Sequence, residues 1–142
     1  MSYIVKQILK LDDLVARENA RKTVLLYEPE ETLRDLYSLY LSRHDFIVKH
    51  CLKEEDLQSA IGFLKPHILV WSFPPGSEPL STSTLVRVVR KQYPSLPVVT
   101  IGIAGQTQHL RHLVSAGITS HIERSLSRPQ DLVIIVKTLL EH

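Results

Sequence analysis

Short apolar runs alternate along this chain with longer segments whose apolar residues recur every three or four positions. Five runs read as buried strands: Val24–Tyr27, Phe46–Lys49, Ile68–Trp71, Pro97–Ile101 and Ile118–Ile122. The segments between them carry helical stripes, as in Leu57, Ala60, Ile61 and Leu64. Continuous apolar strands that alternate with amphipathic helices are typical of a parallel sheet covered on both faces. Right-handed crossovers then predict an α/β, flavodoxin-like, doubly wound sheet of five parallel strands in the order 2-1-3-4-5.

Length and composition indicate one globular domain, since the chain has 142 residues of which 44% are hydrophobic and 23% charged. The 17 basic and 15 acidic residues give a net charge of +2, which does not favour nucleic-acid binding. Cys51 is the only cysteine, so an internal disulfide is excluded and a reducing compartment is compatible. No apolar run approaches the roughly 20 residues that span a bilayer, and Lys6 and Lys10 interrupt the apolar N-terminus, unlike a secretory signal. We therefore expect a cytoplasmic protein without membrane association.

The first residues differ from the rest of the chain. Ile4, Ile8, Leu11 and Val15 recur at helical spacing, which predicts an N-terminal helical extension over residues 1–21 before a main domain over 22–142. This extra helix could pack on its own domain or pair with a second copy. A stripe of two heptads is short for an independent coiled coil, which favours packing on the domain.

Polar residues follow the first and third predicted strands. Glu28, Pro29 and Glu30 come directly after the first strand, and Ser72 comes directly after the third. In a sheet of this order, the carboxyl ends of these two strands flank the functional crevice. We therefore expect Glu28 and Ser72 to lie close together in the candidate site.

With this pattern in place, residues 22–142 resemble the receiver domain of bacterial response regulators. The segments that carry the resemblance are Lys22–Glu30, Lys65–Ser72, Tyr93–Val99 and Ala116–Ile122. The resemblance implies autocatalytic transfer of a phosphoryl group from a histidine to an aspartate at the end of the third strand. Two acidic residues after the first strand would help that aspartate to hold a divalent ion. A hydroxyl after the fourth strand and a lysine after the fifth would complete the site.

The chain keeps one acidic residue of this family pattern, Glu28, and departs from it at the other functional positions. Pro29 replaces the second acidic residue, Ser72 replaces the acceptor aspartate, and Gly102 stands at the hydroxyl position, with Thr100 two residues upstream. Arg124 stands at the lysine position and His121 at the aromatic switch position of the fifth strand. A site with one carboxylate and a neutral hydroxyl is expected to hold a divalent cation poorly, and without the metal a transferring phosphoryl group lacks its main neutraliser.

These departures predict a pseudo-receiver that is not an enzyme, needs no metal or cofactor, and signals through protein contact without phosphorylation. Two alternatives stay open. Ser72 could be a phosphoacceptor or an enzyme nucleophile activated by Glu28, or the chain could be the receiver part of a transcriptional regulator. His109 and His112 lie three apart on a predicted helix, but this spacing alone is a weak metal motif.

The expected partner is another signalling protein or a second copy of the chain. The resemblance places the contact on the last two helices and the fifth strand, about residues 106–142, where Arg111, His121 and Arg124 are candidate interface or switch residues. The N-terminal helix is the second candidate surface. Arg87, Arg90 and Lys91 form a basic helix face, but the chain has no nucleic-acid-binding motif beside it, so direct nucleic-acid binding is not expected.

Three local features of the sequence concern helix ends and the third strand. Gly117 is predicted to be a left-handed helix cap, and Ser127 with Gln130 is predicted to form a capping box at the start of the last helix. Strand alternation places Trp71 and Phe73 on one face and Ser72 on the other. Trp71 is expected in the core, whereas Phe73, Pro74 and Pro75 are expected to stiffen the following loop and make it apolar, which favours a protein contact.

Overall fold

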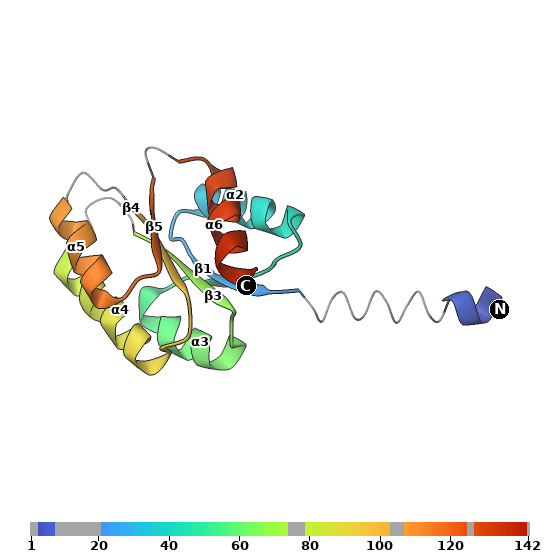
Figure 1. Cartoon of the computed structure of the whole chain (residues 1–142), viewed down its shortest axis with the longest axis horizontal. Coiled ribbons are helices and arrows are strands. Elements are labelled where there is room, and N and C mark those ends of the chain that lie inside the picture. The colour runs from blue at the N-terminus through green and yellow to red at the C-terminus, as the bar shows by residue number, and fades with distance from the viewer. Residues whose placement is uncertain (1–2, 8–20, 74–78, 103–106, 125–126, 142) are drawn as a thin grey trace.

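The computed structural model describes residues 3–7, 21–73, 79–102, 107–124 and 127–141 (Figure 1). The strands are β1 (Thr23–Tyr27), β2 (Ile47–Cys51), β3 (Ile68–Ser72), β4 (Val98–Gly102) and β5 (Ser120–Glu123). The helices are α2 (Glu31–Arg43), α3 (Leu57–Leu64), α4 (Pro79–Gln92), α5 (Thr107–Ala116) and α6 (Pro129–Leu140), and a 3₁₀ turn, η1 (Glu54–Asp56), precedes α3.

The five strands form one sheet in the order β2-β1-β3-β4-β5, and every neighbouring pair is parallel. This confirms the predicted flavodoxin-like fold and strand order. The register pairs Tyr27 with Trp71 and Ser72 with Ile101, so β1, β3 and β4 end at the same edge of the sheet. The residues that follow these strands are therefore brought together, as the order predicts.

Two hydrophobic clusters lie on opposite faces of the sheet, and Figure 1 shows the helices that cover them. On one face Leu69 and Trp71 of β3 pack in a cluster with residues of α3, α4 and α5. On the other face Ile68 and Val70 pack in a cluster with residues of α2 and α6. The three inner strands, β1, β3 and β4, are mostly apolar and are buried along almost their whole length because both of their faces are covered.

The cluster on the α3–α5 face also contains Phe73, which is only 2% exposed. The rings of Trp71 and Phe73 lie 5.7 Å apart between centroids. The expectation for Trp71 is confirmed, but Phe73 is a core residue and does not make the loop apolar. Its aromatic ring continues the strand alternation one residue beyond β3. Pro74 and Pro75, the rest of that expected apolar loop, lie outside the described residues.

Of the predicted N-terminal helix, residues 3–7 are described, and they are helical. Tyr3 and Ile4 are 75% and 69% exposed, so their apolar side chains are not covered. Ile8, Leu11 and Val15, which complete the predicted stripe, lie outside the described residues. The boundary between residues 21 and 22 stays a prediction. Within the described segments, no helix is both long and apolar enough to cross a membrane.

The two predicted helix caps have different outcomes. Gly117 has a φ of +101°, so the left-handed cap is confirmed. The predicted box of Ser127 and Gln130 is wrong, because the backbone N–H of Arg128 donates to Asp131 Oδ2 at 2.7 Å and α6 begins at Pro129. Ser127 instead donates its hydroxyl to the Glu123 carbonyl at 2.6 Å. Pro129 is well suited to the first helical position, so the helix begins there and the cap residue is Arg128 instead of Ser127.

Candidate functional site

Glu28 and Ser72 meet where β1 and β3 end, and both residues are fully buried. Ser72 is the last residue of β3 and shares the face of Val70, which packs toward α2 and α6. Glu28 follows β1 directly, and its backbone carbonyl accepts a hydrogen bond from Arg34 Nη1 of α2 at 3.3 Å. A carboxylate buried so completely needs a nearby positive charge or loses much of its tendency to ionise.

Arg124 provides that charge. It directly follows β5, and its backbone N–H donates to the Gly102 carbonyl at 2.8 Å, which continues the sheet pairing by one step. Its Nη2 donates a hydrogen bond to Ser72 Oγ and lies 3.6 Å from Glu28 Oε2. The Arg124 side chain is only 16% exposed. The guanidinium therefore lies directly against the two groups that the sequence placed in the crevice.

The Glu28 carboxylate is only partly compensated. Its two oxygens accept no hydrogen bond of normal geometry from the described residues. Burial raises the pKa of Glu28, and the neighbouring Ser72 hydroxyl and Arg124 guanidinium lower it without cancelling that effect. Glu28 is thus held as a buried acid whose ionised form is disfavoured, beside a cation that does not fully satisfy it.

The remaining predicted positions contribute differently. Pro29 is exposed and offers no side-chain ligand. At Gly102 an added Cβ would lie 3.5 Å from His121 Cε1, an ordinary contact, so the space admits a small side chain that this chain does not have. Thr100 does not replace the missing hydroxyl. It shares the face of Val98, opposite to Ser72, and its Oγ1 lies 2.7 Å from His121 Nδ1.

The site therefore assembles Glu28, Ser72 and Arg124, with Gly102 as a backbone acceptor, while His121 pairs with Thr100 on the other face of the sheet. Arg111 is exposed on α5, and its role in docking stays a prediction. The Arg124–Ser72 bond and the Thr100–His121 pair were not predicted from the sequence. The signal for the Arg124–Ser72 bond is a paired replacement. Where the resembled family has a lysine and an aspartate, this chain has the longer-reaching Arg124 and the uncharged Ser72.

The chemistry of this site does not favour a divalent metal. Such an ion prefers several anionic oxygens, whereas Glu28 contributes one carboxylate and a guanidinium lies beside it. No group of three histidine, cysteine, aspartate or glutamate side chains converges among the described residues. The side chain of His109, one half of the histidine pair, lies outside them.

Replacing Glu28 by glutamine is expected to raise the free energy of unfolding at pH 7 by about 1 kcal/mol, because it removes the cost of burying an ionised carboxylate. A folded-state pKa above the ordinary 4.5 means that the wild type loses stability as pH rises through that pKa. The advantage of Glu28→Gln should therefore shrink as pH falls toward 4.5. Urea denaturation at several pH values between 4.5 and 7 measures the difference in free energy of unfolding between the wild type and Glu28→Gln.

Glu55→Gln, at an exposed position of η1, is the control. Destabilisation by Glu28→Gln at pH 7 would mean that the ion pair with Arg124 outweighs burial.

No protein family model matches the chain, and no characterised protein matches it by sequence. Solved structures do match. A response regulator receiver domain protein (CheY-like) from Methanospirillum hungatei superposes with a TM-score of 0.75 at 15% identity, over 86% of this chain and 95% of that one. A response regulator from Thermotoga maritima has a TM-score of 0.74 at 17% identity, over 86% and 99%.

NtrX from Brucella abortus has a TM-score of 0.72 at 22% identity, over 85% of this chain but only 26% of NtrX. The match thus spans nearly the whole of the first two solved chains and about a quarter of the third. At these identities the matches establish the fold, which is that of CheY-like receiver domains.

Proposed function

We propose that this chain is a pseudo-receiver, a module of two-component signal transduction that acts through phosphorylation-independent contact with another signalling protein. The observation that carries the proposal is the Arg124 guanidinium, which donates to Ser72 and lies 3.6 Å from Glu28 Oε2. It supplies a fixed internal cation where a phosphorylatable receiver needs a metal ion. A module of this kind is not an enzyme and requires no cofactor.

The physical argument has two steps. A divalent ion would have to bind one carboxylate beside a guanidinium, so repulsion and the shortage of anionic oxygens both oppose it. Without that ion, the charge that develops on a transferring phosphoryl group is poorly neutralised, and a serine hydroxyl is a weak nucleophile. The receiver architecture is thus retained while the groups that perform its chemistry are replaced.

The direct test is incubation of the full chain with acetyl phosphate and Mg²⁺, followed by intact-mass measurement. We expect the mass of the wild type to stay unchanged. Beryllofluoride with Mg²⁺ should likewise leave the fluorescence of Trp71, the single tryptophan, unaltered. A receiver domain with its aspartates intact serves as the positive control. A stable phosphoryl adduct on the wild type would contradict the proposal.

One observation favours a second candidate function. Burial raises the pKa of Glu28, and a carboxylate with a raised pKa next to a serine is a better general base than an ordinary one. Ser72 could then accept a phosphoryl or acyl group. Against this, Ser72 is completely buried and its hydroxyl already accepts a hydrogen bond from Arg124. An adduct that disappears in Ser72→Ala would establish this alternative.

The partner proposal uses the α5–β5–α6 side of the domain, about residues 106–142, as a docking face for another signalling protein or for a homodimer, in the cytoplasm. Arg111 is exposed there, whereas the Arg124 side chain is turned into the site. If Arg111→Glu loses binding to the partner protein while the matching Arg124 variant keeps it, the contact is made by the exposed surface and not through the site. The alternative that the chain is the receiver part of a transcriptional regulator is supported only by its match to one quarter of the NtrX chain.

A further inference from the structure

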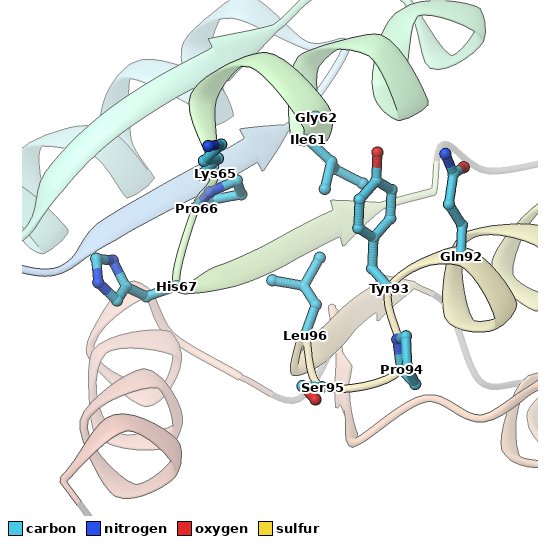
Figure 2. Close-up of a pocket in the computed structure, with 10 residues that line it drawn as sticks. All are labelled: Ile61, Gly62, Lys65, Pro66, His67, Gln92, Tyr93, Pro94, Ser95 and Leu96. Carbon is cyan, nitrogen blue, oxygen red and sulfur yellow. The ribbon is translucent and has the colours of Figure 1, made fainter.

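A hollow of about 540 Å³ lies at the amino ends of β3 and β4, whereas Glu28 and Ser72 lie at the carboxyl ends of β1 and β3. Figure 2 shows the Ile61 side chain of α3 beside the ring of Tyr93, which follows α4 together with Leu96, while Pro66 and His67 come from the segment before β3. Its volume is in the range of ligand pockets in proteins. Because it lies at the amino ends of the strands, it is separate from the candidate site.

The wall of the hollow is mainly apolar, with Lys65 as the charged side chain among its lining residues, and several of its other polar groups bond within the domain. The Tyr93 hydroxyl donates to the Gln58 carbonyl at 3.3 Å, and Gln58 Nε2 donates to Gln92 Oε1 at 3.0 Å. His67 Nδ1 accepts the Thr23 backbone N–H at 2.9 Å. Burial, with a smaller contribution from Lys22, holds the pKa of His67 below its usual value, which keeps the imidazole neutral at pH 7. An apolar occupant fits such a wall.

The chain carries an uncovered apolar segment that can reach this hollow. Tyr3 and Ile4 of the N-terminal helix are 75% and 69% exposed, and in Figure 1 this helix lies on the side from which the chain enters β1. Thr23, the first residue of β1, is hydrogen-bonded to His67 on the wall of the hollow. Residues 8–22 connect the two, a length of roughly 22 Å even if wholly helical and more if extended.

We propose that this hollow is the docking site of the chain's own N-terminal segment, with Tyr3 and Ile4 packed against Pro66, Tyr93 and Pro94, the apolar lining residues that are not already buried in the core. Burying two large apolar side chains removes surface whose exposure is unfavourable. The short connection gives the segment a local concentration in the millimolar range, which favours docking on its own domain over capture by a second copy. The domain then has a covered surface at one edge, remote from Glu28 and Arg124, that a partner could expose by displacing the segment.

Paramagnetic broadening in the full chain tests this contact. A nitroxide is attached to Ser2→Cys in a Cys51→Ser background, and amide signals are recorded for ¹⁵N-labelled protein. We expect the amides of Lys65, His67 and Ser95 to lose most of their intensity, while amides at the other end of β1 and β3 keep theirs. Ile4→Asp should restore the lost signals, whereas the matched polar change Lys6→Ser in the same helix should not.

Mixing distinguishes the two possible sources of the segment. When spin-labelled chains without ¹⁵N are mixed with ¹⁵N-labelled chains without the nitroxide, we expect no broadening at the hollow. Broadening in the mixture would overturn the proposal in favour of exchange between two copies. Unchanged intensities at Lys65, His67 and Ser95 in the labelled chain would overturn it outright. The amide spectrum itself confirms that each variant is folded, so loss of the contact is not confused with loss of the domain.

Discussion

With Pro29→Asp and Ser72→Asp combined, the chain is expected to bind Mg²⁺ saturably in the millimolar range, whereas the wild type does not. Glu28 and residue 72 already meet at the ends of β1 and β3, and residue 29 is exposed at the same edge. The double variant therefore places three carboxylates at one edge, the kind of oxygen ligands that a hard cation requires. Titration followed by Trp71 fluorescence measures the change, since Trp71 immediately precedes the altered residue.

The Arg124 guanidinium should weaken this engineered site, because it competes with the metal for the carboxylates. Adding Arg124→Lys, which replaces the planar fork by a compact ammonium, is expected to tighten Mg²⁺ binding further. The matched control is Pro29→Asn with Ser72→Asn, which has similar side-chain size without the charge and should not bind. Failure of the folded acidic variant to bind Mg²⁺ would mean that the missing carboxylates are not what separates this site from a metal-binding one.

The sequence was sufficient to predict the strand order and the meeting of Glu28 with Ser72. Both depend on chain-wide regularities. Apolar runs flanked by amphipathic helices specify a parallel sheet, and the sheet then brings the ends of its first and third strands together whatever residues stand there. The position of Gly117 was also predictable, because a positive φ at a helix end is a local property that favours glycine.

The arrangement inside the site was not predictable in the same way. Arg124 and Ser72 are 52 residues apart, and only the three-dimensional path of an arginine side chain decides that they bond. The cap of α6 shows a similar limit. Both Ser127 with Gln130 and Arg128 with Asp131 stand at capping-box spacing, and the bond from the Arg128 N–H to Asp131 forms in the structure. Phe73 was misassigned because the sequence does not reveal how far the core extends beyond the last paired residue of a strand.

Arg90→Ala is expected to lower the free energy of unfolding by about 3 kcal/mol, because Arg90 satisfies four acceptors from two separate turns. Its guanidinium donates to the carbonyls of Pro94 at 2.9 Å and Leu96 at 2.6 Å, and to the Gly117 carbonyl at 2.8 Å and Thr119 Oγ1 at 3.1 Å. These contacts join the turn before β4 to the turn before β5. Urea denaturation measures the loss, and Arg87→Ala, at an exposed position of the same helix, should change stability by no more than about 0.5 kcal/mol.

The bonds from Arg90 also hold the turn that contains Gly117 and Thr119. This turn leads from α5 into β5, which are parts of the proposed docking face. A Cβ added at Gly117 would lie 2.9 Å from Arg90 Cγ, in addition to the strain of a φ of +101°. Gly117→Ala should therefore destabilise the wild type more than it destabilises Arg90→Ala, where the close contact is gone. A double-mutant cycle that gave additive losses would contradict this coupling. A change below about 1 kcal/mol for Arg90→Ala would show that water replaces the guanidinium at these carbonyls, and that the turn before β5 is held by the sheet alone.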